Sequence, residues 1–269
     1  MHGLGNDFVL FDAMTDPINL SADQIRLIAD RHFGIGCDQL LLLEPAKGDQ
    51  ADLNYRIFNS DGGEVEHCGN GARCAAVYLR DSGRVSKEEI IAETSGGLIK
   101  LVCQPNEQVT VDMGVPRFEP GEIPILADQR ASQYQLTVDG SEFEFSALSV
   151  GNPHAVILTD SVDSAPVESL GPILESHPFF PERVNVGFMQ IIDRGHIRLR
   201  VFERGVGETL ACGTGACAAV VVGRLQDILD ETVTVDLPGG QLKISWGGEG
   251  QSVMMTGSAT RVFEGEIDL

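Results

Sequence analysis

The sequence predicts an α+β protein of two pseudo-symmetric halves, each a mixed sheet or barrel wrapped around a central buried helix. First, short apolar runs between 31 glycines and 12 prolines outnumber the helical stretches, which favours strands. Second, two of the helical stretches are apolar on nearly every face, a pattern typical of buried helices. Third, a motif that precedes one of these two helices recurs before the other. Together they predict two sheets, each built around its own helix.

The individual elements follow from apolar periodicity and turn residues. In chain order, the clearest strands are 8–11, 40–43, 109–111 and 233–235, and the clearest helices are 21–32, 71–81, 164–176 and 215–229. Ser21 can cap the first helix, because its hydroxyl can accept a hydrogen bond from the first turn. The helices at 71–81 and 215–229 are the two apolar ones.

We expect the boundary between the two halves to lie in a segment of the chain with few apolar residues. A stretch rich in Pro and Glu at 116–124, followed by a polar stretch at 128–135, is suited to a crossover. We therefore expect an N-terminal half over 1–115 and a C-terminal half over 116–257. The tail, about 258–269, is expected to return to the N-terminal half.

Composition and charge narrow the choice of partners. The 269 residues are 42% hydrophobic, enough for a folded core, and the net charge is −21. An acidic surface repels phosphate backbones and anionic lipids, so we expect neither a nucleic-acid nor a membrane partner. The sequence has no apolar run near the roughly 18 residues that cross a bilayer and no signal-like N-terminus, which indicates a cytoplasmic location.

The strongest organisational signal is an internal duplication. Residues 57–72 align with residues 201–216 at a constant offset of 144, and seven of the 16 pairs are identical. Upstream polar residues recur at an offset of 146: Gly5, Asn6 and Gln39 stand opposite Gly151, Asn152 and Asn185. We infer two halves of one architecture that face each other across a pseudo-twofold axis, each contributing one cysteine.

These two cysteines, Cys68 and Cys212, are placed for acid/base chemistry. Each opens a Cys-Gly-(Asn/Thr)-Gly-Ala sequence before an apolar helix, where unpaired N–H groups favour a thiolate. A helix end contributes up to about 2 kcal/mol, or roughly 1.5 pKa units, so we expect each thiol to approach half ionisation at neutral pH. Two such ends that converge form a carboxylate site. Thiols on opposite faces of an α-carbon would invert it without pyridoxal phosphate.

The other motifs lead to no further site. The remaining cysteines are expected in the core: Cys37, Cys74, Cys103 and Cys217. The Cys-x5-Cys and Cys-x4-Cys spacings within helical segments do not suit a zinc site, so we expect no metal. The glycines follow neither the Gly-x-Gly-x-x-Gly spacing of dinucleotide-binding loops nor the Gly-x4-Gly-Lys-(Ser/Thr) spacing of phosphate-binding loops. We therefore expect no cofactor.

Five segments resemble the signatures of the diaminopimelate epimerase family. They are Met-His-Gly-Leu-Gly-Asn-Asp-Phe at 1–8, Asn-Ser-Asp-Gly at 59–62, Cys-Gly-Asn-Gly-Ala-Arg-Cys at 68–74, Gly-Asn-Pro-His at 151–154 and the Glu-Arg-Gly and Ala-Cys-Gly-Thr-Gly parts of 203–215. The resemblance implies two α/β halves, each a sheet around a central helix, that close over the substrate. It also implies an isomerase that forms a homodimer and interconverts LL- and meso-diaminopimelate in the lysine and cell-wall pathway.

The resemblance also implies a role for each site residue. Cys68 and Cys212 would be the two acid/base residues, with His154 and Glu203 helping to ionise the thiols. The remaining residues would bind substrate: Gly69, Asn70, Gly213 and Thr214 the reacting carboxylate through their amides; Asn6, Gln39 and Glu203 its ammonium; and Asn59, Asn152, Asn185 and Arg204 the distant centre. Members of the family usually begin a few residues earlier and carry an apolar residue at the position of His67.

Two other functions stay open. One is a relative of the same fold that acts on proline or hydroxyproline, for which a guanidinium such as that of Arg204 at the far end is not needed. The other is a redox or scaffold protein in which Cys68 and Cys212 form a regulatory disulfide.

Overall fold

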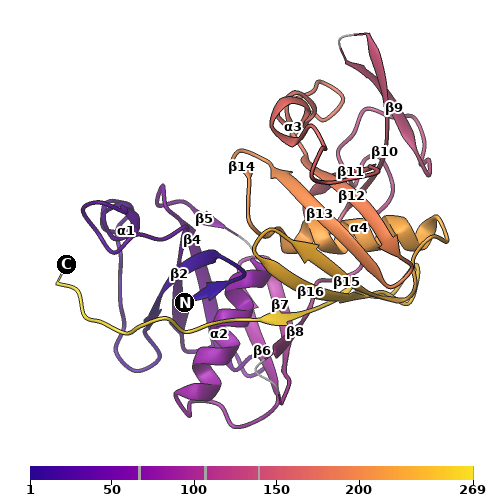
Figure 1. Ribbon diagram of the computed structural model, residues 1–269. Helices are drawn as coiled ribbons and strands as arrows, with labels where there is room; N and C mark the ends of the chain where they lie inside the picture. Colours follow the sequence, from indigo (N-terminus) through magenta and orange to yellow (C-terminus); the bar gives the residue numbers. More distant parts are fainter. Residues whose placement is uncertain (66–67, 106–107, 139, 269) are drawn as a thin grey trace. The chain divides into compact units, whose positions relative to one another are not determined.

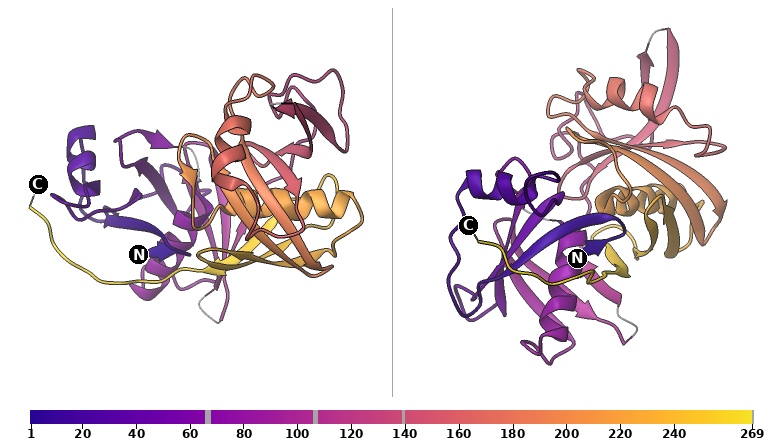
Figure 2. Two further views of the ribbon diagram at one scale, coloured as in Figure 1. Left: turned by 45° about the horizontal axis from the view of Figure 1, so that its top comes forward. Right: turned by 60° about the vertical axis from the view of Figure 1, so that its left-hand side comes forward.

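The computed structural model describes residues 1–65, 68–105, 108–138 and 140–268, so that His67 lies outside the described residues. The chain divides into two compact units: Met1–Asp112 with Thr256–Leu269, and Met113–Met255. Each unit is an α+β assembly in which strands surround one central helix (Figures 1 and 2). The predicted fold class is confirmed.

The first unit is a mixed sheet with two helices. Its elements are β1 (His2–Gly3), β2 (Asn6–Asp12), α1 (Ala22–Ala29), β3 (Gln39–Glu44), β4 (Leu53–Asn59), β5 (Glu64–Val65), α2 (Gly69–Asp81), β6 (Glu89–Thr94), β7 (Gly97–Cys103) and β8 (Gln108–Asp112). β2 and β3 are parallel, β3 and β4 antiparallel, β4 and β6 parallel, and β6 and β7 antiparallel. Ten of the 13 residues of α2 are buried.

The second unit repeats this pattern. Its elements are β9 (Tyr134–Val138), β10 (Ser141–Ser149), β11 (Pro153–Leu158), α3 (Val167–Glu175), β12 (Asn185–Asp193), β13 (His196–Glu203), β14 (Gly207–Glu208), α4 (Gly213–Leu225), β15 (Thr232–Leu237) and β16 (Gly240–Ser245). β11 and β12 are parallel, β12 and β13 antiparallel, β13 and β15 parallel, and β15 and β16 antiparallel. β17 (Met254–Ser258) then leads the chain back to the first unit.

Strand register confirms the internal duplication. Phe8 pairs with Gln39 between β2 and β3, and His154 pairs with Asn185 between β11 and β12. Both residues of the second pair lie 146 positions after those of the first, the offset found in the sequence. The two units therefore share topology and local register.

This topology gathers polar residues at one edge of each sheet. Since β2 and β3 are parallel and β4 is antiparallel to them, the starts of β2 and β3 lie at the same edge as the end of β4. Asn6, Gln39 and Asn59 occupy these three positions. Asn185 and Glu203 occupy the matching positions at the start of β12 and the end of β13.

The four expected helices are present with shifted ends. Ser21 caps α1 as predicted, but the helix ends at Ala29 rather than residue 32, because the Asp30 carboxylate accepts hydrogen bonds from the amides of His32 and Phe33 and forms a turn. The helix expected at 164–176 is shorter at both ends (Val167–Glu175). The other two expected helices begin two residues earlier than predicted, and α4 ends at Leu225 instead of residue 229.

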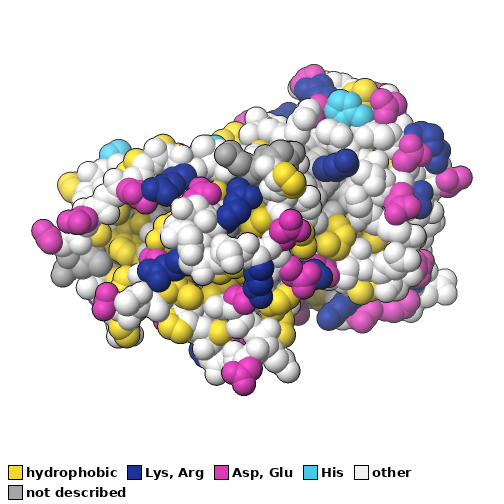
Figure 3. Space-filling view, turned by 90° about the horizontal axis from the view of Figure 1, so that it is seen from below, with side chains coloured by type: hydrophobic (Ala, Val, Ile, Leu, Met, Phe, Trp, Pro, Cys, Tyr) yellow, Lys and Arg dark blue, Asp and Glu magenta, His cyan; other side chains and the backbone are white. Residues whose placement is uncertain are grey.

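Ion pairs place basic side chains beside some of the acidic ones on the surface. In Figure 3 basic and acidic side chains are interspersed on the face shown. Arg31 binds Asp7 at 2.8 Å and Asp38 at 2.7 Å, which ties the start of β2 to the residue before β3. In the described residues no helix is long and apolar enough to cross a membrane.

Gly34 provides a test of packing in the first unit. A Cβ added there would lie 1.8 Å from the Leu27 carbonyl oxygen, whereas a Cβ on Gly48 would meet nothing within 4 Å. We predict that Gly34→Ala lowers the free energy of unfolding by about 1–3 kcal/mol or more, because the backbone must move, and that Gly48→Ala does not lower it. Urea denaturation of both variants measures this. Equal stability of the two would contradict the packing described here.

Candidate active site

Cys68 occupies the N-cap of α2. Its backbone is extended, with φ −144° and ψ 110°, and its carbonyl accepts the first helical hydrogen bond from Ala72 at 2.9 Å. The Tyr55 hydroxyl donates to the same carbonyl at 3.2 Å. A Cβ on Gly71 would lie 2.4 Å from that hydroxyl, so this close approach requires glycine in the Cys-Gly-Asn-Gly sequence.

The Cys68 thiol contacts an amide side chain. Its sulfur donates to Asn6 Oδ1 at 3.9 Å, and Asn70 Nδ2 donates to the same oxygen at 3.2 Å. Asn6 Nδ2 in turn donates to Asp38 at 3.0 Å. The structure thus brings the predicted residues Asn6 and Asn70 to the first cysteine and holds Asn6 through Asp38, the residue before β3.

A buried arginine supports this arrangement. Arg73 is fully buried and donates to Asn70 Oδ1 at 2.9 Å, to the Gly69 carbonyl at 3.4 Å and to the Ser258 carbonyl at 3.2 Å. Sequence reasoning assigned it no role. A charged residue within the otherwise apolar stretch 72–77 was the signal that could have revealed it.

Gln39 and Asn59 lie together on neighbouring strands. They are direct partners in the β3–β4 register, and Gln39 Nε2 donates to Asn59 Oδ1 at 2.8 Å. Their side chains are partly buried, so this bond fixes both amides at the edge of the sheet that also carries Asn6.

Cys212 occupies the same position on α4. Its φ is −107° and its ψ 104°, and its carbonyl accepts from Ala216 at 3.0 Å. The sulfur lies 3.7 Å from the Thr214 hydroxyl. A Cβ on Gly215 would approach the sulfur to 3.2 Å, so glycine again permits close contact between the first turn and the thiol. Gly213 is the first residue of the helix.

A carboxylate distinguishes this second thiol from the first. Burial raises the pKa of Cys212 well above its ordinary value, and the neighbouring Glu203 carboxylate raises it further. Burial also raises the pKa of Glu203. Hydrogen bonds from Thr209 and from the Cys212 thiol lower this pKa and partly offset the effect of burial. The expectation of a half-ionised thiol is therefore wrong for Cys212, because loss of water outweighs the effect of the helix end on its pKa.

His154 reaches Cys212 only through other side chains. It is buried, and its Nε2 lies 2.9 Å from Asn152 Oδ1, while Asn152 Nδ2 donates to the Thr214 hydroxyl at 3.4 Å. Burial, with a smaller effect of Arg204, lowers the pKa of His154 to about 3. The imidazole is therefore neutral at physiological pH.

Asn185 is tied to backbone on both sides. Its Nδ2 donates to the Pro153 carbonyl at 2.9 Å, and its Oδ1 accepts from the Arg204 amide at 3.0 Å. The Arg204 guanidinium donates to the Glu182 carbonyl at 3.1 Å. Asn185 thus fixes the peptide that carries Arg204.

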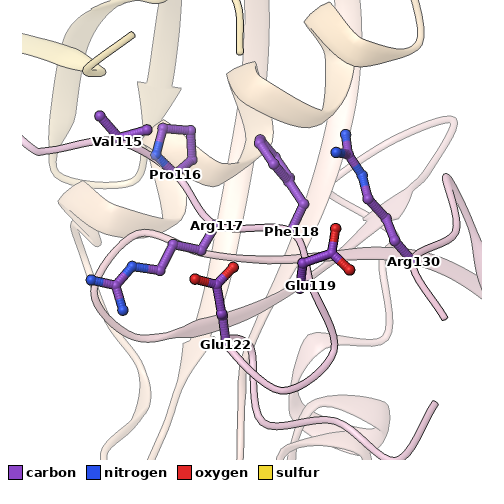
Figure 4. Close-up of a pocket in the computed structure, with 7 residues that line it drawn as sticks. All are labelled: Val115, Pro116, Arg117, Phe118, Glu119, Glu122 and Arg130. Carbon is purple, nitrogen blue, oxygen red and sulfur yellow. The ribbon is translucent and has the colours of Figure 1, made fainter. Parts of the chain in front are cut away.

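One surface pocket lies outside the set of predicted site residues. The pocket in Figure 4 lies on the segment between β8 and β9. There the guanidinium carbon of Arg130 lies 4.5 Å from the centre of the Phe118 ring. Its lining contains none of the predicted site residues: Val115, Pro116, Arg117, Phe118, Glu119, Glu122 and Arg130. Among residues 1–65, 68–105, 108–138 and 140–268, no three His, Cys, Asp or Glu side chains form a group that could hold a metal ion.

The four remaining cysteines are core residues, as predicted. Cys37, Cys74, Cys103 and Cys217 are buried. Burial raises the pKa of Cys37 to about 11 and that of Cys74 to about 12, so both are thiols at neutral pH.

Comparison with known proteins identifies the family of the sequence. The family model described as Diaminopimelate epimerase matches residues 1–119 and 146–262. The chain is 60% identical to a protein of Thioalkalivibrio sulfidiphilus named Diaminopimelate epimerase, over 100% of this chain and 98% of the relative. A protein of the same name from Alkalilimnicola ehrlichii is 58% identical, over 100% of this chain and 97% of the relative.

Solved structures share the fold at lower identity. A hydroxyproline epimerase from Agrobacterium vitis, with bound trans-4-hydroxy-L-proline, superposes with a TM-score of 0.66 at 21% identity and covers 96% of this chain and 87% of its own. A probable proline racemase from Agrobacterium radiobacter superposes with a TM-score of 0.67 at 19% identity and covers 100% and 91%. Both likenesses support the fold.

The Glu203 carboxylate should control the ionisation of Cys212. We predict that Glu203→Gln moves the midpoint of Cys212 alkylation by iodoacetamide to lower pH, because the charge that opposes the thiolate is removed while burial remains. Mass spectrometry of the Cys212 peptide across a pH series measures the midpoint. Glu208→Gln is the matched control, since Glu208 pairs with Arg200. An unchanged midpoint in Glu203→Gln would show that the carboxylate does not act on the thiol.

Proposed function

We propose, since the chain belongs to the diaminopimelate epimerase family, that it interconverts LL- and meso-diaminopimelate with Cys68 and Cys212 as its two acid/base residues. The reaction belongs to lysine and peptidoglycan precursor synthesis and uses no pyridoxal phosphate. One observation carries the assignment: two cysteines cap the buried helices of two units with the same topology. A cytoplasmic location and a homodimer are further parts of the proposal and rest on sequence and resemblance alone.

The proposed reaction is one proton removal and one proton return. A thiolate takes the α-proton, so the C–H bond breaks and an S–H bond forms. The other thiol gives its proton to the opposite face of the same carbon, so its S–H bond breaks and a new C–H bond forms. The carbanion between these steps spreads its charge into the α-carboxylate, which the helix amides of Gly69, Asn70, Gly213 and Thr214 would hold.

The polar edges of the two sheets would bind the rest of the substrate. Asn6, Gln39 and Glu203 are proposed to bind the reacting ammonium. Asn59, Asn152, Asn185 and Arg204 are proposed to bind the distant amino-acid centre, with Arg204 pairing with its carboxylate in a bidentate manner. The hydrogen bonds of Asn185 support an indirect part for this residue, because both run to backbone near Arg204.

The surroundings of Cys212 support an order for the two proton transfers. Burial and Glu203 favour the protonated form of Cys212, which would begin as the proton donor. A substrate ammonium bound to Glu203 would weaken its repulsion of the thiolate and ease the reverse direction. His154 is neutral and contacts Asn152, so we propose that it orients Asn152 and Thr214 rather than taking the proton itself.

Cysteine replacement tests the two-base assignment. Cys68→Ala and Cys212→Ala should each lower the rate of LL-diaminopimelate epimerisation by about 10²–10⁴-fold or more, because one face of the carbon loses its acid/base group. Cys74→Ala and Cys217→Ala are controls within the same helices and should keep a rate near that of the unaltered enzyme. Chiral chromatography of the products measures all four. Comparable losses in the controls would contradict the assignment.

Replacement of Arg204 tests substrate choice. Arg204→Lys should raise KM for diaminopimelate roughly tenfold or more, because an ammonium cannot reproduce the planar pairing with a second carboxylate. Steady-state assays with diaminopimelate, proline and hydroxyproline measure the preference. If the unaltered chain prefers a cyclic substrate, or Arg204→Lys leaves KM unchanged, the role given to Arg204 is wrong.

A further inference from the structure

A buried carboxylate lies behind Arg204. Glu175 is the last residue of α3 and is only 2% exposed. Its Oε1 accepts from the Gly205 amide at 2.8 Å, and its Oε2 accepts from Arg183 Nη2 at 2.6 Å. A carboxylate removed from water is costly unless both oxygens are hydrogen-bonded, and here both are. Such a group holds its partners in defined positions.

The turn that Glu175 holds contains two proposed site residues. Glu203 and Arg204 directly precede Gly205, and the Val206 amide closes the turn on the Glu203 carbonyl at 3.1 Å. Gly205 has a φ of +73°, a conformation that favours glycine and fixes the direction of its amide. The Glu175 carboxylate receives that amide.

The Arg204 backbone is consequently held from both sides. Asn185 accepts the amide of Arg204 itself, and Glu175 accepts the amide of the next residue. The Val184 amide also donates to the Glu175 carbonyl at 3.1 Å, which ties α3 to the segment whose Glu182 carbonyl accepts the Arg204 guanidinium. Glu175 thus accepts hydrogen bonds from the residue that follows Arg204 and from a residue close to Glu182, which accepts the Arg204 guanidinium.

We propose that Glu175 is a positioning residue that sets the direction in which Arg204 is presented, and thereby favours substrates with a second carboxylate. This inference rests on the proposed binding role of Arg204. A merely structural role for Glu175 would lower stability and kcat together. A positioning role would instead appear in KM for diaminopimelate and would depend on the Arg204 side chain.

Single variants of the full chain separate these roles. Glu175→Ala should raise KM for LL-diaminopimelate by about tenfold or more with a smaller change in kcat, since it removes a hydrogen bond between a charged group and the turn. Glu175→Gln should recover most of the affinity, because its amide oxygen can accept from Gly205. Glu168→Ala is the control: Glu168 is an exposed carboxylate on the same helix, and KM should stay within about twofold. If Glu175→Ala fails to fold, Glu175→Asp takes its place, since its shorter side chain withdraws from Gly205.

A double-mutant cycle decides the proposal. In an Arg204→Ala background, Glu175→Ala should raise KM no further, because the side chain that it positions is absent. Additive effects, or an unchanged KM in Glu175→Ala alone while Arg204→Ala raises it, would overturn this inference and leave the proposed function standing. An unchanged KM in Arg204→Ala would overturn both, and that single variant identifies this case without any change at Glu175.

Discussion

The N-terminus of a buried helix is the constraint on which this protein is built. In each unit a sheet surrounds one helix, so the end of that helix is fixed by packing rather than by a mobile loop. The residue at that end is a cysteine in both units, and glycine in the third position of the helix leaves room for close neighbours. Polar side chains then gather nearby, because parallel and antiparallel neighbours bring strand ends to one edge. The position of each thiol is therefore a property of the whole unit.

The duplicated framework carries unlike chemistry in its two halves. Glu203 occupies the position of Asn59 in the other half, and Cys217 occupies that of Arg73, both at the offset of 144. One thiol thus lies beside amides on a helix with a buried cation, and the other beside a buried carboxylate. Equal backbones with unequal electrostatics suit a reaction in which one sulfur gives a proton while the other takes one. In the proposed mechanism, this difference between the halves gives the two thiols different roles.

Local sequence patterns predicted the framework well, because they report backbone requirements. Ser21 was identified as a cap, the duplicated Cys-Gly-x-Gly motif placed a cysteine at or near the start of each central helix, and the repeat at an offset of 146 is matched by the strand register. Burial was harder to predict. The helix end alone suggested a Cys212 thiol that approaches half ionisation, whereas burial and Glu203 raise its pKa. Arg73 and Glu175 lie outside the predicted set because their importance comes from hydrogen bonds between segments distant in sequence.

Uptake of deuterium from the solvent at low conversion tests the two-base claim most directly. LL-diaminopimelate is incubated with the enzyme in deuterated water, and substrate and product are separated at low conversion and analysed for deuterium at the α-carbon. With two thiols, the product should carry solvent deuterium while the recovered substrate remains almost entirely protiated, because the removed and returned protons lie on different sulfur atoms. Product that retains the substrate hydrogen, or substrate that exchanges as fast as product forms, would indicate one base and contradict opposed cysteines.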